Sequence, residues 1–325
     1  MLFNVCALYI KIMNNENQTI HKSNDNLTIY GWNEKLNQLK QESIYSTLAH
    51  GRVSIVHRTC YEVISGNGLF QCELTGNMMY GKSDDELPCT GDWVIFQPFD
   101  EHKGIIVDSL PRERTLYRKK SGTVADKQVI ASYVDKAFIV QSLDDNFNVR
   151  RVERFMVQIM EENISSVLVL NKADLDFDRQ SVEEQIKHIS SQIPVFFTSI
   201  HQLETIVRLR KSISEGETVV FVGSSGVGKS SLVNALCEKP VLLTSDISLS
   251  TGKGRHTSTR REMVLMDSSG VLIDTPGVRE FGLAIDNPDS LAEVLEISDY
   301  AESCRFKDCK HINEPGCAVL EAVNS

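Results

Sequence analysis

One stretch of eight residues combines glycines, a lysine and hydroxyl side chains at a fixed spacing. It reads GSSGVGKS at residues 223–230 and lies between the apolar runs 219–222 and 232–236. Glycines let backbone amides turn inward around a phosphate, the lysine neutralises phosphate charge, and the serine hydroxyl after it can bind magnesium. Between a strand and a helix, this pattern predicts a phosphate-binding loop. Its candidate residues are Gly223, Ser224, Ser225, Gly226, Val227, Gly228, Lys229, Ser230 and Ser231.

A second motif, DTPG at residues 274–277, follows the apolar run 270–273. Asp274 is expected to hold magnesium through a water, together with Ser230, and the Gly277 amide is expected to sense the terminal phosphate. On its own, D-x-x-G is more often a turn. At a strand end downstream of a phosphate loop, it indicates a nucleotide switch.

The polar and basic segment STGKGRHTSTR, residues 250–260, lies between these two motifs. Its position is that of a first switch, where a threonine completes magnesium coordination once a triphosphate is bound. Thr257 and Thr259 are both candidates, and the sequence does not choose between them. A flexible solvated loop is the alternative interpretation.

A third motif, NKAD at residues 171–174, has the chemistry to recognise guanine. The Asp174 carboxylate can accept hydrogen bonds from the ring N–H and the exocyclic amine of guanine, a pair of donors that adenine lacks. Lys172 is expected to cover the base with its stem, and Asn171 to support the loop. Ser199, after the next apolar run, is a candidate base contact, although a serine at a strand end is more often a helix cap.

The order of the motifs is unusual, because the base-reading motif precedes the phosphate loop. If the sheet is that of other guanine-nucleotide proteins, the chain must be circularly permuted. Whatever follows DTPG is then attached directly to a switch.

The last 22 residues hold three of the eight cysteines. Cys304, Cys309, His311 and Cys317 form the pattern C-x4-C-x-H-x5-C, which fits a closed, tetrahedral, structural zinc site. Incidental cysteines in a helix are the alternative. The other cysteines are scattered and are expected to be reduced core or surface residues.

The motifs need a rigid frame, and the chain offers two patterns. Five apolar runs read as parallel strands of a doubly wound α/β domain with helices over 150–163 and 180–192: 135–142, 165–174, 193–199, 218–226 and 270–277. Five shorter runs, rich in β-branched and aromatic residues, suit a small closed barrel of the OB type, with a sandwich fragment as the alternative: 51–58, 60–65, 69–76, 91–98 and 103–110. A short helix is expected over 30–41.

Composition is that of a globular protein, with 41% hydrophobic and 24% charged residues. The net charge of -10 argues against uniform coating of nucleic acid, so RNA binding would need local basic patches such as PRERTLYRKK, residues 111–120. No apolar run reaches the roughly 18 residues that span a bilayer. The apolar first 13 residues lack a signal-peptide pattern, so we expect a cytoplasmic protein whose true start could be Met13. We also expect the protein to be a monomer.

Taken together, the motifs resemble the ribosome small subunit-dependent GTPase A family over residues 30–325. The resemblance rests on the permuted NKAD, GSSGVGKS, GRHTST, DTPG and the tail DCKHINEPGCAV. It implies an OB-fold barrel, a permuted GTPase domain and a small helical zinc module, with late maturation of the small ribosomal subunit as the function. GTP, GDP, magnesium and one zinc are the implied cofactors, and ribosomal RNA is the implied partner. The expected division of the chain is 1–45, 46–112, 113–283 and 284–325, the last segment being shorter than in the family.

Val278 follows DTPG, where many GTPases keep a glutamine that positions the attacking water, so slow intrinsic hydrolysis is expected. His256 is the hypothetical substitute, with Lys229 as the other catalytic candidate. Gly226 occupies the position where related GTPases carry a potassium-binding asparagine, so no potassium dependence is expected. The alternatives are a GTP-binding RNA scaffold with negligible hydrolysis and a phosphate-loop enzyme for another nucleotide.

Overall fold

The computed structural model describes residues 27–83, 85–119, 127–238, 261–266, 269–274, 300, 303–306, 309, 315–318 and 321. Five predicted site residues lie outside this part of the chain, and of Asp274 only the backbone is described. They are His256, Thr257, Thr259, Gly277 and His311. Within the described residues, none of the helices combines the length and apolar character that a membrane crossing requires.

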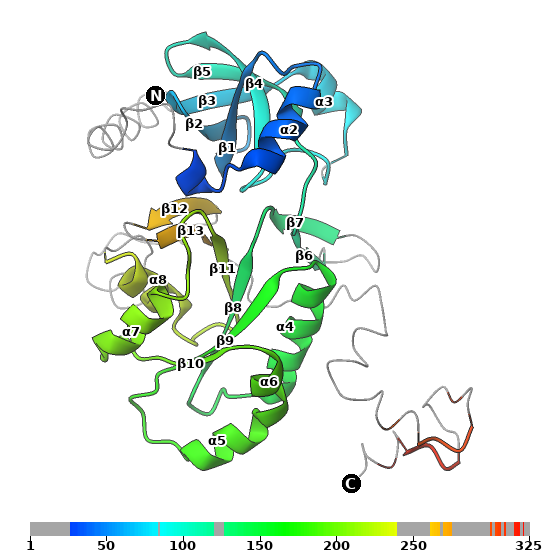
Figure 1. Cartoon of the computed structure of the whole chain (residues 1–325), viewed down its shortest axis with the longest axis vertical. Coiled ribbons are helices and arrows are strands. Elements are labelled where there is room, and N and C mark those ends of the chain that lie inside the picture. The colour runs from blue at the N-terminus through cyan, green and yellow to red at the C-terminus, as the bar shows by residue number, and fades with distance from the viewer. Residues whose placement is uncertain are drawn as a thin grey trace.

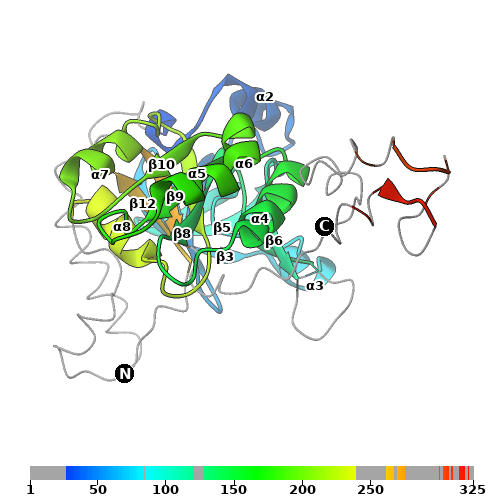
Figure 2. The ribbon, with the colours of Figure 1, turned by 90° about the horizontal axis from the view of Figure 1, so that it is seen from below.

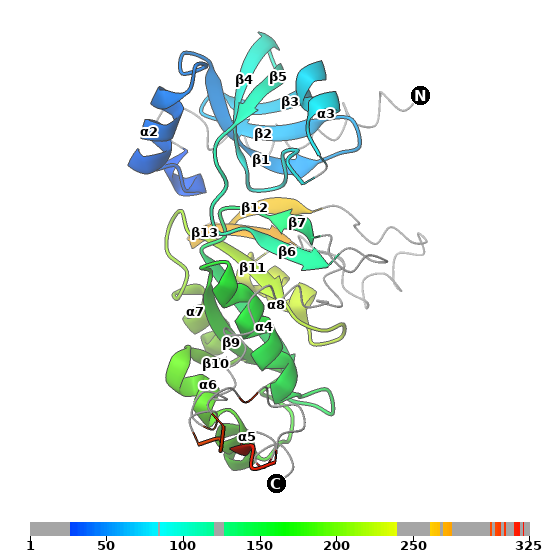
Figure 3. The same cartoon turned by 90° about the vertical axis from the view of Figure 1, so that its right-hand side faces the viewer.

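The first strands close into a barrel, as predicted. They are β1 (Ala49–Val56), β2 (Tyr61–Ser65), β3 (Gly68–Leu74), β4 (Trp93–Asp100) and β5 (Lys103–Ser109). Their order is β1-β2-β3-β5-β4, and the additional pairing of β4 with β1 closes the sheet (Figure 3). In β2, Tyr61, Val63 and Ser65 are buried and alternate with partly exposed residues, as expected for a strand with one face on a core.

Short helices accompany the barrel. The 3₁₀ turn η1 (Thr28–Tyr30) and α2 (Glu34–Glu42) precede it, and α3 (Gly76–Gly81), which the sequence did not predict, joins β3 to β4. The Asn33 side chain caps α2 by accepting a hydrogen bond from the Leu36 amide at 3.1 Å. The helix expected over 30–41 is therefore confirmed with slightly different ends.

Part of the basic run 111–120 is built into the fold and makes internal contacts. Residues Leu116–Lys119 form β6, paired with β7 (Lys127–Ala131) in a two-stranded sheet. Arg112 binds the Asp92 carboxylate at 2.8 Å, and Arg114 binds Asp135 at 3.0 Å. Two of the five basic residues are therefore used to hold the fold together.

The larger domain contains the predicted parallel sheet. Its order is β12-β13-β11-β8-β9-β10. The parallel strands are β8 (Lys136–Ser142), β9 (Ser165–Asn171), β10 (Val195–Phe197), β11 (Thr218–Val222) and β13 (Ser269–Asp274). The sequence reading missed β12 (Glu262–Met266), which pairs antiparallel with β13.

Helices cover both faces of this sheet (Figures 1 and 2). On one face lie α4 (Val149–Glu161), α5 (Arg179–Gln185) and α6 (Lys187–Gln192), and on the other lie α7 (Leu203–Arg210) and α8 (Lys229–Leu236). The two hydrophobic clusters separate in the same way, with Ile139 in the first and Phe138 and Val140 in the second. This alternation is the sign of a strand buried on both faces.

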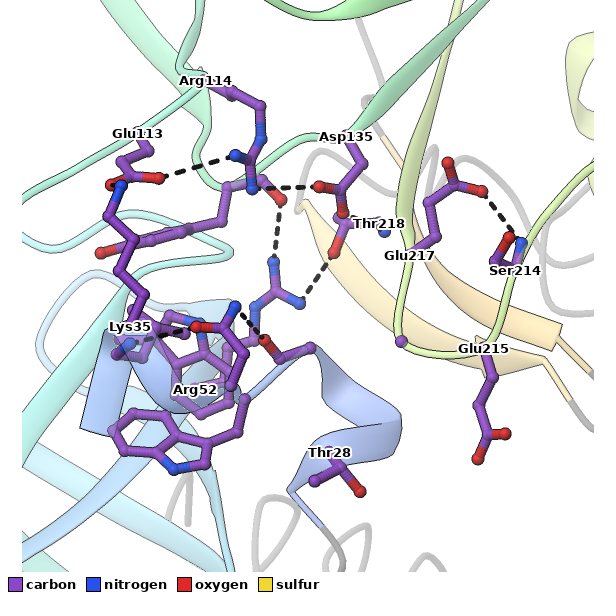
Figure 4. Close-up of a pocket in the computed structure, with 17 residues that line it drawn as sticks. Thr28, Lys35, Arg52, Glu113, Arg114, Asp135, Ser214, Glu215, Glu217 and Thr218 are labelled. Carbon is purple, nitrogen blue, oxygen red and sulfur yellow. Dashed lines mark hydrogen bonds and ion pairs between the residues drawn. The ribbon is translucent and has the colours of Figure 1, made fainter. Parts of the chain in front are cut away.

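A fully buried arginine joins the barrel to the sheet. Arg52, in β1, donates to the Gly91 carbonyl at 3.0 Å and to the Thr218 hydroxyl of β11 at 2.8 Å. Figure 4 shows Arg52 reaching Thr218, and Arg114 reaching Asp135, beside a pocket of about 470 Å³. This pocket lies at the start of β11, whereas the predicted phosphate loop follows the end of the same strand.

A second contact joins the two parts through backbone pairing. Ile55 of β1 pairs with Glu262 of β12, and Glu262 pairs in turn with Asp274 at the end of β13. The barrel is thus one strand away from the backbone of the predicted magnesium residue.

Candidate nucleotide and metal sites

The phosphate loop joins β11 to α8 and has backbone geometry that glycine permits. Gly223, Gly226 and Gly228 have φ values of +147°, +84° and +90°. A Cβ at Gly223 would lie 2.3 Å from the Val140 carbonyl oxygen. The loop therefore passes too close to β8 for any side chain at this position.

Lys229 begins α8 and folds back over the loop. Its ammonium donates to the carbonyl oxygens of Gly223 and Ser224, both at 2.7 Å. The ammonium is thus held against the backbone of the loop that the motif predicts to bind phosphate. Ser230 and Ser231 follow in the first turn of the same helix.

The loop that carries NKAD, predicted to read the base, is in direct contact with the predicted phosphate loop. The Asn171 side-chain amide donates to the Val227 carbonyl at 2.9 Å and accepts from the Thr198 hydroxyl at 3.3 Å. A Cβ at Gly228 would lie 2.4 Å from the same Asn171 nitrogen. Asn171 is buried and lies at the end of β9, and its side chain links the two loops.

Asp174 and Ser199 lie side by side. The Ser199 hydroxyl donates to the Asp174 carboxylate at 2.5 Å and accepts from the His201 amide at 3.1 Å. The hydrogen bond from Ser199 lowers the pKa of Asp174, so the carboxylate stays ionised and able to accept hydrogen bonds at neutral pH. The structure thus places Ser199 beside the predicted guanine contact.

The magnesium candidates come from neighbouring strand ends. Strands β11 and β13 are parallel and pair at Val220 and Ile273. Asp274 is the last residue of β13, and Ser230 lies in the helix that follows β11, so both belong to the carboxyl ends of adjacent strands. A hydroxyl and a carboxylate are oxygen ligands of the kind that magnesium prefers. The donor types and their shared edge of the sheet fit the ion.

The three described cysteines of the tail form a cluster whose sulfur atoms all lie within 4.8 Å of one another. The Cys304 and Cys317 sulfur atoms are 3.8 Å apart. Two thiolates that share a tetrahedral zinc at ~2.3 Å lie roughly 3.8 Å apart, so this spacing fits zinc. The Arg305 amide donates to the Gly316 carbonyl at 3.1 Å and ties the two cysteine-bearing turns together.

Comparison with known proteins decides the family. The model of the RsgA GTPase family matches residues 109–284. The small ribosomal subunit biogenesis GTPase RsgA 1 of Bacteroides thetaiotaomicron is 75% identical over 302 residues, which are 93% of this chain and 85% of that protein. The RsgA protein of Methanosarcina acetivorans is 39% identical over 322 residues, 96% of this chain and 85% of the relative.

This chain belongs to the RsgA GTPase family.

Solved structures agree with the architecture of an RsgA protein. The crystal structure of YjeQ from Thermotoga maritima matches with a TM-score of 0.61 and 26% identity over 85% of this chain and 91% of that one. YloQ, described as a circularly permuted GTPase, matches in fold with a TM-score of 0.60 and 22% identity over 87% and 90% of the two chains. The predicted permutation, barrel and family are therefore confirmed.

The sequence reading of this RsgA chain missed one charged residue at the base-reading loop. Asp144, two residues after β8, accepts a hydrogen bond from the Lys172 ammonium at 2.7 Å. The sequence does show that Asp144 follows the end of a parallel strand, and three such strand ends meet at this site. Asp144 belongs to no motif, however, so the sequence pattern alone does not distinguish it from other surface aspartates.

Proposed function

We propose that the chain hydrolyses GTP to GDP and phosphate and acts in biogenesis of the small ribosomal subunit, as its curated relatives are named. One observation carries the choice of nucleotide. Asn171 fastens the base-reading loop to the phosphate loop, and Asp174 is held ionised beside Ser199. A carboxylate fixed there can accept both guanine donors at once, and adenine does not offer that pair.

In this proposal the loop amides and Lys229 bind the phosphates, and Ser230, Asp274 and either Thr257 or Thr259 hold magnesium. The ion would neutralise charge that develops on the phosphates. The Gly277 amide responds to the terminal phosphate. Because Val278 cannot orient water, His256 is the proposed water-positioning residue, acting when the ribosome is bound.

The other parts of the molecule have proposed roles as well. The barrel, residues 46–112, and the zinc module, residues 284–325, contact ribosomal RNA, and residues 113–283 form the GTPase domain. Zinc binds Cys304, Cys309 and Cys317, with His311 as the fourth ligand. The protein acts as a cytoplasmic monomer on the small subunit.

The deciding experiment measures phosphate release by the purified protein from GTP, with ATP as control, in the presence and absence of small ribosomal subunits. Stimulation that is specific for GTP supports the proposal, and His256→Ala should abolish that stimulation while GDP binding persists. Tight GTP binding without stimulated turnover would favour the RNA scaffold instead. Equal use of ATP would reject the guanine assignment.

A further inference from the structure

Lys172 is held at both ends. Its backbone has a φ of +62°, a left-handed conformation that few lysines adopt, and its ammonium lies 2.7 Å from an Asp144 carboxylate oxygen. A lysine side chain has many rotamers, so holding it in one place costs free energy that the ion pair must offset. The ion pair therefore restricts the side chain to one position.

Asp144 is itself fixed by its neighbours. One carboxylate oxygen accepts from the Ser142 hydroxyl at 2.6 Å and from the Asn146 amide at 3.0 Å, and the other oxygen is used by Lys172. Partial burial raises the pKa of Asp144, but the hydrogen bonds from Lys172 and Ser142 outweigh it and lower the pKa to about 2. Asp144 is thus a fixed negative charge at neutral pH.

The loop that carries Asp144 is tied to the NKAD loop. Ser142 pairs with Asn171 in the parallel ladder of β8 and β9, and the Leu143 amide donates to the Asn171 carbonyl at 2.9 Å. Strand β8 lies between β9 and β11, the strands that lead into the base-reading and phosphate loops. A third strand end therefore contributes a charged residue to the proposed guanine pocket.

We propose that Asp144 is a positioning residue for the guanine nucleotide. Its carboxylate holds the Lys172 side chain in place, so that the stem of the lysine covers the base. The inference rests on the proposed function, since it assumes that NKAD reads guanine. Its physical basis is preorganisation. Each rotamer-rich side chain that binding must immobilise weakens the affinity, and Asp144 removes that cost for Lys172.

The test is the Kd for GDP labelled with a fluorophore on the ribose, measured for Asp144→Asn. The cost of ordering one lysine predicts a Kd raised about two- to tenfold. The KM for GTP should rise by the same factor, with kcat at saturating GTP unchanged. The matched control is Asp145→Asn, the exposed neighbouring aspartate, which should leave the Kd unchanged. An unchanged or lower Kd for Asp144→Asn would overturn the proposal.

A double-mutant cycle separates positioning from direct contact. Lys172→Met keeps the stem and removes the amine, so Asp144 has nothing left to hold. In that background Asp144→Asn should not raise the Kd further, whereas an equal increase in both backgrounds would show that Asp144 acts on the nucleotide itself and would overturn the positioning role. If the wild-type protein binds no labelled GDP, the proposed function fails first, and the two failures are distinguished.

Discussion

At the scale of single residues, Gly228 lies where the phosphate loop passes against Asn171. Gly228→Ala adds a Cβ 2.4 Å from the Asn171 amide nitrogen at a φ of +90°. The Asn171 side chain must then move, which disturbs its hydrogen bond to the Val227 carbonyl and changes the spacing of the two loops. We expect GDP to bind about tenfold more weakly or worse, a loss of at least ~1.4 kcal/mol, in fluorescence titrations.

Gly226→Ala is the control for this prediction. Its φ is +84°, but a Cβ there meets no atom within 4 Å. This variant should be about 1–2 kcal/mol less stable because of the left-handed backbone alone. Its affinity for GDP should fall much less than that of Gly228→Ala. Similar losses of GDP affinity in both variants would show that backbone strain, and not the contact with Asn171, causes the loss.

At the scale of elements, a buried ion pair anchors β4 and the segment before β6. The Asp92 carboxylate is fully buried and accepts from Arg112 at 2.8 Å and from the Ser132 hydroxyl at 2.6 Å. Asp92→Ala leaves Arg112 without its carboxylate and should lower the free energy of unfolding by about 3 kcal/mol in urea titrations. Asp100→Ala, which breaks an exposed pair with Lys103, should change it by less than ~0.5 kcal/mol.

The packing of the N-terminal segment on β1 predicts a pH dependence. The His50 ring packs at a tilt against Trp32 with centroids 4.1 Å apart, and burial, with a smaller contribution from Lys40, lowers the pKa of His50 to about 4. The unfolded chain binds the proton more tightly, near pH 6.5, so this group destabilises the fold as pH falls from about 6.5 towards 4. His50→Phe should reduce the loss of thermal stability between pH 7 and pH 5. An unchanged pH dependence would rule His50 out as its source.

At the scale of the whole molecule, the hydrogen bonds of Arg52 join the barrel to the GTPase domain, so we expect the two to unfold together. The protein has two tryptophans, Trp32 and Trp93, both on the barrel side, so their fluorescence reports on the barrel. Bound GDP stabilises the domain that binds it, by about 2.7 kcal/mol at a concentration of 100 Kd. In the wild type, GDP should therefore raise the unfolding midpoint that tryptophan reports.

Arg52→Met removes the hydrogen bond from β1 to Thr218 and should largely abolish this shift while GDP still binds. Lys35→Met is the control, because it breaks only an exposed ion pair with Glu113 beside the same pocket. If GDP shifts the tryptophan transition equally in Arg52→Met and in the wild type, the domains are coupled by another contact, such as the Ile55–Glu262 pairing.

The motifs could be found from the sequence because their chemistry is local. A phosphate loop needs Gly223, Lys229 and Ser230 at a fixed spacing within eight consecutive residues. A strand buried on both faces needs a continuous apolar run, so both features leave a pattern in neighbouring residues. The order of motifs likewise sufficed to predict the permutation. Contacts between distant residues leave no such pattern. Asp144 meeting Lys172, or Arg52 reaching Thr218 across 166 positions, depends on which strands become neighbours, and only the folded sheet decides that.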